Sequence, residues 1–203
     1  MSPRTAEQNE QIRATTRQRL IGAALALFAE HGYQGTSVRM IAEAAGVAQG
    51  LLYSHFEGKQ ALLHAIFEES VGDVRESFAI ADAAPPGERL ERLIRGSFAV
   101  LERNLPFWRL SYGVRMQPAV LAGLGPALHE WTASIRRTLQ GYLRDAGVPN
   151  PEIEAAVLFA LIDGISQHYV LDPQRYPLNA VTELIVSRFC GTRRVSASRR
   201  GRR

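Results

Sequence analysis

Residues 36–59 read TSVRMIAEAAGVAQGLLYSHFEGK, and this stretch decides the fold of the chain. Two short helical patterns flank the turn Ala45-Gly46-Val47. Gly46 tolerates the left-handed backbone of a tight turn, Ala42 leaves room for the next helix to cross closely, and Val47 fills the angle between the two helices. The spacing predicts a helix-turn-helix, a motif whose second helix enters the major groove of DNA.

The second helix of this motif, predicted from Gln49 to Phe56, has an uncharged outward face. Leu52 and Phe56 lie four residues apart, so both can pack inward against Ile41 and Ala45. The side chains left outward are those of Gln49, Gly50, Leu51, Tyr53 and Ser54. In a major groove, glutamine pairs with a base edge, a small residue permits close approach, and an apolar side chain meets a thymine methyl group. A tight helical corner without DNA contact is the alternative, but it does not account for the uncharged outward face.

Basic and hydroxyl side chains surround this face. Arg39, His55 and Lys59 are placed to hold phosphates and to set the register on the duplex. Thr36 or Ser37 is expected to cap the preceding helix, because a side-chain oxygen there can accept a hydrogen bond from an exposed backbone amide. The stretch therefore combines residue types suited to base contact with residue types suited to phosphate contact.

Helical periodicity dominates the rest of the chain, and almost no alternating stretch is long enough to predict a strand. The first helix is predicted from Asn9 to His31 and ends at Gly32, and its inward stripe is Leu20, Ala24, Leu27, Phe28 and His31. Further helices are predicted from Lys59 onward and over residues 88–104, 126–146, 151–171 and 177–189. The predicted fold class is all-α: a three-helix helix-turn-helix head on a larger helical body, with about nine helices.

Proline and glycine interrupt the helical pattern most clearly at residues 83–87, AAPPG. We predict a DNA-binding head over residues 10–75, a ligand-binding and dimerisation body over 76–190, and a disordered arginine-rich tail over 191–203. Six of the 24 basic residues lie in this tail, and the remaining 18 stand against 20 acidic residues. The net charge of +4 thus belongs to the tail and is no argument for nucleic-acid binding by the whole chain.

Missing motifs exclude several classes of protein. No apolar run of about 18 residues occurs, and the first residues lack the apolar centre of a secretory signal, which predicts a cytoplasmic protein. Cys190 is the only cysteine, so no internal disulfide or multi-cysteine zinc site can form, and no metal or other cofactor is predicted. HExxH, P-loop and GxSxG motifs are absent, so no catalytic site is predicted and an enzyme is not expected.

From about Arg17 to Glu69, the chain resembles the amino-terminal domain of the TetR family of transcriptional regulators in helix order, helix lengths and turn motif. The resulting set of predicted DNA-binding residues is Thr36, Ser37, Arg39, Gln49, Gly50, Leu51, Tyr53, His55 and Lys59. The resemblance implies phosphate contacts for Tyr53 and Lys59. Ala48 departs from the family, which often has a serine or threonine cap there, and the missing cap costs about 1 kcal/mol locally.

A single helix-turn-helix buries too little surface for tight and selective binding, so we expect a homodimer that reads a palindromic operator. The last two helices are the expected contact, and the family arrangement is a four-helix bundle with two helices from each subunit. The predicted interface residues are Ala155, Ile162, Ile165, Ser166, Val181, Leu184, Ile185 and Phe189. For about half of these positions the core of the single subunit is the alternative, because two faces must be buried at once.

In the TetR family, a small molecule bound in the body changes operator affinity. The side chains predicted to bind an apolar or cationic ligand are Trp108, Tyr112, Met116, Trp131, Phe159, Asp163 and His168. Packing in the core is the alternative for each of them. The predicted function is a sequence-specific transcriptional regulator, a repressor, that a small molecule releases or tunes. A helical ligand-binding or scaffold protein without specific DNA readout is the alternative function, and it predicts charge or bulk on the recognition face.

Overall fold

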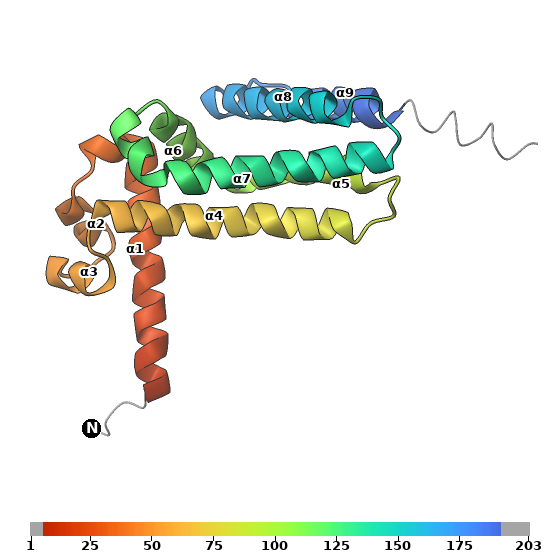
Figure 1. The fold of residues 1–203 in the computed structure, drawn as a ribbon. Coiled ribbons are helices and arrows are strands. Elements are labelled where there is room, and N and C mark those ends of the chain that lie inside the picture. The colour runs from red at the N-terminus through yellow and green to blue at the C-terminus, as the bar shows by residue number, and fades with distance from the viewer. Residues whose placement is uncertain (1–5, 192–203) are drawn as a thin grey trace, which may run out of the picture. The chain divides into compact units, whose positions relative to one another are not determined.

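The structure, a computed structural model, describes residues 6–191 without the side chains of residues 119, 121, 122, 126 and 127 (Figure 1). This part of the chain contains nine α-helices and no strand, which confirms the predicted all-α fold. The helices are α1 (Ala6–Gly35), α2 (Val38–Ala44), α3 (Gln49–His55), α4 (Lys59–Asp82), α5 (Arg89–Arg103), α6 (Leu105–Arg115), α7 (Pro118–Asp145), α8 (Pro151–Leu171) and α9 (Leu178–Cys190). None of these described helices is both long and apolar enough to cross a membrane. The tail predicted to be disordered lies, beyond Gly191, outside the described residues.

The helices form two compact units. The first contains Met1–Val71 together with Pro106–Leu124, and the second contains Gly72–Leu105 together with Gly125–Arg203. The first unit thus includes α6 and the first turns of α7, which the predicted head of residues 10–75 does not. Phe107 of α6 is 1% exposed and meets the Phe67 ring of α4 edge-on, with the ring centroids 5.2 Å apart. This aromatic contact lies within the first unit and joins α6 to α4.

The core of the first unit is built around α1. The buried face of this helix consists of Thr16, Leu20, Ile21, Ala24 and Phe28, at the three- and four-residue steps of an amphipathic helix. Gly32 leaves the helical conformation with φ 74°, as expected for a glycine at a helix end. The prediction that His31 lies inward is wrong, because its side chain is 43% exposed beside this break in the helix.

The second unit packs α5 against α8 and α9. The four residues of α5 predicted to lie inward are all buried: Leu90, Ile94, Phe98 and Leu101. Arg95 of α5 donates through both Nη atoms to the carboxylate of Glu183 in α9, and through Nε to Glu91 at 3.0 Å. Tyr142 of α7 donates its hydroxyl hydrogen bond to Asp82 of α4, and burial together with this bond raises the pKa of Tyr142.

Two helices differ in extent from the prediction. The aromatic-rich segment after Pro106 forms α6, because proline is tolerated in the first turn of a helix, where its missing N–H would have no intrahelical partner. The helix predicted to start at Pro126 starts instead at Pro118. Pro118 occupies the first position of α7, and the helix continues through residue 126 although a proline there supplies no backbone N–H to the helical ladder.

Candidate DNA-binding site

The turn between α2 and α3 closes with two backbone hydrogen bonds. The Gly46 N–H donates to the Glu43 carbonyl and the Val47 N–H donates to the Ala42 carbonyl, each at 3.0 Å. This pair of bonds is a Schellman motif, in which Gly46 takes the left-handed conformation with φ 65°. A Cβ atom at position 46 would also lie 2.9 Å from Nη2 of Arg19. Both the backbone and the available space therefore favour glycine in the predicted turn.

Ser37 and Thr36 have separate roles at the start of α2. The Ser37 hydroxyl accepts a hydrogen bond from the Met40 N–H at 3.2 Å and so caps α2. Thr36 is 1% exposed, and its hydroxyl lies 3.1 Å from the Leu27 carbonyl and 2.9 Å from the Gly32 carbonyl, to which it donates. The prediction that the Thr36 side chain contacts DNA is corrected accordingly, because this side chain is turned inward onto the end of α1.

Helix α3 is anchored by apolar side chains on one face. Leu52 is fully buried, and Phe56 directly after the helix is 6% exposed. Ile41 and Ala45, the expected partners across the turn, are buried as well. Ala48 precedes the helix without a side-chain cap, so the orientation of α3 depends on these buried residues and not on capping.

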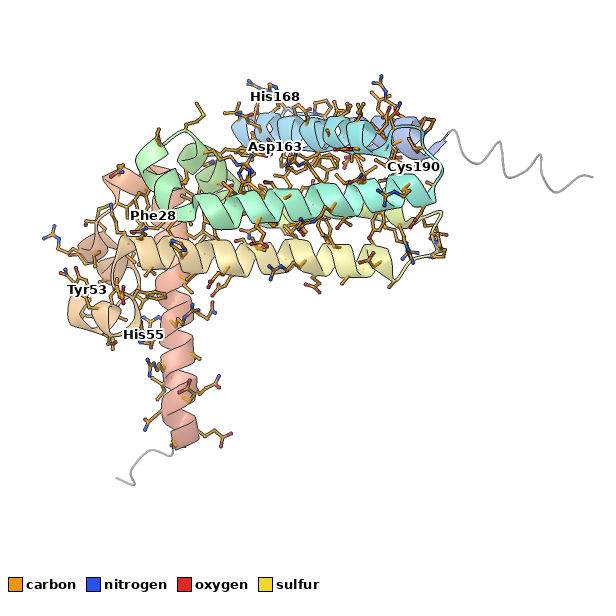
Figure 2. All side chains as sticks on the ribbon, in the orientation of Figure 1. Phe28, Tyr53, His55, Asp163, His168 and Cys190 are labelled. Carbon is orange, nitrogen blue, oxygen red and sulfur yellow. The ribbon has the colours of Figure 1, made fainter. Side chains whose placement is uncertain are left out.

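The opposite face of α3 is exposed and uncharged. Leu51 is 44% exposed and Tyr53 is 52% exposed. Tyr53 is labelled on this helix in Figure 2. The other exposed residues of this face are Gln49, Gly50 and Ser54. A Cβ atom at Gly50 would meet no atom within 4 Å, so packing inside the protein does not require glycine there. The absence of a side chain instead leaves the backbone of α3 open to close approach from outside.

Two of the three side chains predicted to hold phosphates around this face lie on α2 and α3. Arg39 is exposed, and its Nε lies 3.6 Å from Oε1 of Glu43, one helical turn further on. His55 is partly exposed at the end of α3. Burial, together with the positive charges of Arg13 and Arg17, lowers the pKa of His55. His55 is therefore a neutral donor or acceptor at neutral pH.

Lys59, the third of these residues, connects α4 to the last turn of α1 and to the residue that follows it. Its Nζ donates to the carbonyls of Tyr33 and Thr36 at 2.9 and 2.7 Å. The same ammonium lies 4.7 Å from the centroid of the Tyr33 ring, and burial lowers its pKa. An ammonium has three N–H groups, so one remains available for a phosphate.

We expect Lys59→Met to lower the free energy of unfolding by about 1.5–3 kcal/mol, because two backbone carbonyls lose a charged donor. Arg39→Met is the matched control: its side chain is 77% exposed and makes a single pair on its own helix, so its loss costs less than about 0.5 kcal/mol. Urea unfolding followed by circular dichroism measures both variants. Equal stability of Lys59→Met and the wild type would show that these carbonyl contacts do not stabilise the head.

Comparison with protein families assigns both parts of the chain. Residues 20–66 match the model described as bacterial regulatory proteins, tetR family. Residues 86–190, more than half of the chain, match the model described as BetI-type transcriptional repressor, C-terminal. The chain belongs to the TetR family. The predicted class of function is thereby confirmed: this TetR-family protein is a DNA-binding transcriptional repressor.

Individual relatives agree with the family assignment. The fatty acid metabolism regulator protein of Bacillus subtilis (strain 168) is 29% identical over 188 residues, which cover 83% of this chain and 92% of that protein. The HTH-type transcriptional regulator AcrR of Shigella flexneri is 37% identical over 100 residues, 49% of this chain and 46% of that protein. The solved structure of FadR from Bacillus halodurans has a TM-score of 0.74 at 23% identity and covers 87% of this chain and 95% of that one. FadR from Bacillus subtilis in complex with stearoyl-CoA has a TM-score of 0.70 at 24% identity, and the match covers 84% of this chain and 97% of that one.

The ligand-binding residues predicted for this TetR-family protein are divided between the two units. In the first unit, the rings of Trp108 and Tyr112 have centroids 6.3 Å apart, and the Arg115 guanidinium lies over the Tyr112 ring. Met116 is 83% exposed just after the end of α6. The prediction that Met116 lines a ligand site is corrected, because this side chain points into solvent.

The predicted ligand-binding residues of the second unit are Trp131, Phe159, Asp163 and His168. The first three are partly buried. His168, labelled in Figure 2, is exposed. Its ring stacks on the Tyr176 ring with an interplanar angle of 5° and centroids 6.3 Å apart. The prediction that His168 orients a ligand inside the body is corrected, because its ring lies at the surface against the segment that follows α8.

Half of the predicted dimer residues lie in the core of the second unit. Ala155, Ile165, Ser166 and Ile185 are between 2% and 8% exposed, so they are corrected to core positions. Ile162, Val181 and Phe189 are partly exposed, and Leu184 is 64% exposed. Ile153 and Val157 of α8, which are not among the predicted interface residues, are 64% and 46% exposed. Their four-residue spacing places them on one face of α8. Because α8 is apolar on most faces, the periodicity of the sequence did not show which face is exposed.

Proposed function

We propose that this TetR-family protein represses transcription in the cytoplasm by occupying a palindromic operator as a homodimer, and that it acts by binding alone, without catalysis. The head is assigned to residues 10–75 and the body to residues 76–190. The observation behind the proposal is the exposed, uncharged face of α3, which buried Leu52 holds in a fixed orientation. The proposed DNA contacts are Ser37, Arg39, Gln49, Gly50, Leu51, Tyr53, His55 and Lys59.

These residues divide into base-reading and phosphate-binding groups. Gln49 is the first residue of α3, and an amide there pairs with a base edge in the major groove. Leu51 offers an exposed apolar surface to a thymine methyl group. The Tyr53 hydroxyl and the remaining N–H of Lys59 bind phosphates, which fix the register without reading sequence.

A homodimer accounts for the exposed apolar residues of α8 and α9. Ile153, Val157 and Leu184 are each more than 40% exposed, and large apolar side chains gathered on two helices mark an interaction surface. Small residues on α8, Ala156 and Ala160, are also exposed and permit close helix packing. A two-fold pair of these helices gives a four-helix bundle and presents two heads to two half-sites.

The first experiment selects random duplexes with the purified protein at physiological salt and sequences the bound pool. We expect a palindromic site with half-sites about one helical turn, or a multiple of it, apart. Gln49→Ala is expected to relax base preference, whereas Tyr53→Ala weakens binding to every sequence and lowers the salt dependence. A pool without enriched sequence would refute the proposed operator recognition.

Operator affinity is expected to rise as the pH falls from neutral, because a nearby phosphate raises the pKa of His55 above its lowered value in the free protein. Binding then takes up as much as about one proton per subunit. The free energy of unfolding of the head changes in the opposite sense. The unfolded chain binds this proton at the ordinary pKa of histidine, so a falling pH stabilises the unfolded chain relative to the folded one. Fluorescence anisotropy between pH 5.5 and 8 measures the affinity. His55→Gln should remove the pH dependence, and its persistence in this variant would exclude His55 as the source.

The effector is proposed to be apolar, with a fatty acyl thioester as the first compound to test. One relative is the fatty acid metabolism regulator protein of Bacillus subtilis, and a solved relative holds stearoyl-CoA. The proposed contacts are Trp131, Phe159 and Asp163 of the second unit, and Trp108 and Tyr112 of the first unit are separate candidates. Titration of the operator complex with stearoyl-CoA should release the DNA, and CoA without the acyl chain should not. Release by both compounds would assign the effect to the nucleotide and not to the acyl chain.

A further inference from the structure

The amino-terminal part of α1 continues past the segment that packs on the rest of the head (Figure 1). Every residue from Ala6 to Thr15 is exposed, and Thr16 is the first buried residue of α1. A polar helical segment of this length receives little stabilisation from burial. Within the first unit, side chains of this segment face α3 across a groove.

A groove lies between this segment and α3, with a volume of about 370 Å³. The α1 side is formed by Asn9, Ile12, Arg13 and Thr16, and the α3 side is formed by Leu51, Ser54 and His55. Ile12 is 46% exposed and Leu51 is 44% exposed, so the groove has an apolar strip along its length. The three α3 residues also belong to, or border, the exposed face proposed to enter the major groove. The groove is therefore continuous with the proposed DNA-binding surface.

Charge in the groove favours an anionic occupant. No carboxylate lines it, since Glu7 and Glu10 of the same segment are not among the lining residues. Arg13 makes no ion pair among residues 6–191, whereas the neighbouring Arg17 is paired with Glu69 at 3.1 Å. Arg13 thus offers an uncompensated guanidinium, the group that binds phosphate oxygens best.

We propose that this groove holds the sugar–phosphate backbone at the edge of the operator half-site, with Arg13 on a phosphate and with Ile12 against deoxyribose. This inference rests on the proposed operator binding and adds α1 to the contact surface. The exposed part of α1 is ten residues long, or about 15 Å, which spans roughly four phosphates of one strand. Asn9, one turn before Arg13, supplies an amide donor to the same strand.

The test compares Arg13→Ala with Arg136→Ala, which removes an equal charge from an exposed position of α7 in the second unit. Binding to the duplex selected by the wild type is measured by anisotropy across a series of salt concentrations. We expect Arg13→Ala to weaken binding about tenfold and to lower the slope of log affinity against log salt by about 0.9 per subunit. Base preference should stay unchanged, and Arg13→Lys should recover most of the affinity because it keeps the charge. Arg136→Ala should behave as the wild type does.

The outcomes separate this inference from the proposed function. Unchanged affinity and slope in Arg13→Ala, with weakened binding in Tyr53→Ala, would overturn the α1 contact and leave operator binding by α3 in place. An equal loss in Arg13→Ala and Arg136→Ala would also overturn it, because the effect would then follow net charge and not position. Failure of the wild-type protein to select any duplex would instead refute the proposed function. Arg13 is exposed, so circular dichroism should show the same helix content and the same unfolding midpoint in each variant.

Discussion

Leu52→Ala is expected to lower the free energy of unfolding by about 2–5 kcal/mol and to abolish operator binding. Leu52 is fully buried and is the single buried residue within α3, so its truncation leaves a cavity under the recognition helix. Ala48 provides no side-chain cap that would hold α3 in place without this contact. Urea unfolding measures the stability, and anisotropy with the selected duplex measures the binding.

Leu51→Ala is the matched control for this prediction, because the same substitution is made one residue away on the exposed face of α3. Its side chain is 44% exposed, so the expected change in stability lies within about 0.5 kcal/mol. Leu51→Ala should instead change the base preference of the protein at the operator position that the leucine side chain contacts. Equal destabilisation by the two substitutions would mean that α3 does not have one anchored face and one free face.

Leu184→Glu is expected to convert the proposed homodimer into a monomer and to weaken operator binding by at least about a hundredfold. Leu184 is 64% exposed on α9. In a two-fold interface, each subunit would contribute one new carboxylate, so the interface would contain two. Burial of an unpaired charge costs several kcal/mol, which exceeds the contribution of an ordinary contact. Sedimentation velocity measures the oligomeric state, and binding to one half-site and to two half-sites measures the consequence for DNA.

Ile80→Glu is the control for the dimer prediction. Ile80 is 57% exposed on α4 in the same unit, so the substitution introduces the same charge at a similarly exposed apolar position outside α8 and α9. This variant should remain dimeric. A dimeric Leu184→Glu variant would place the subunit interface elsewhere on the protein.

The turn between α2 and α3 could be predicted from the sequence because its determinants are local. Gly46 adopts the left-handed conformation that a turn of this kind needs, and the four-residue spacing of Leu52 and Phe56 identified the buried face of α3. The end of the first helix at Gly32 follows from the same backbone preference. Elements defined within a few residues of chain were therefore predicted well.

Positions that depend on contacts between distant segments were predicted less well. Thr36 is a plausible capping residue by type, but its hydroxyl faces carbonyls of α1, and the chain pattern does not reveal this partner. On α8, apolar residues occupy most faces, so the sequence could not separate buried Ile165 from exposed Ile153. Ile12 and Arg13 precede the apolar stripe of α1, and nothing in their periodicity places them beside α3.

Lys59 is the only lysine in a chain with 24 basic residues, so a single side chain carries an ε-amine. Its ammonium is occupied by the carbonyls of Tyr33 and Thr36, and an amine must lose its proton and leave such contacts before it can be acylated. The rate at which an amine-directed reagent labels the side chain therefore reports how often α4 separates from the α1–α2 connection. Amine acylation thus gives this protein a built-in probe for the opening of its head, with no cysteine or fluorophore to be introduced.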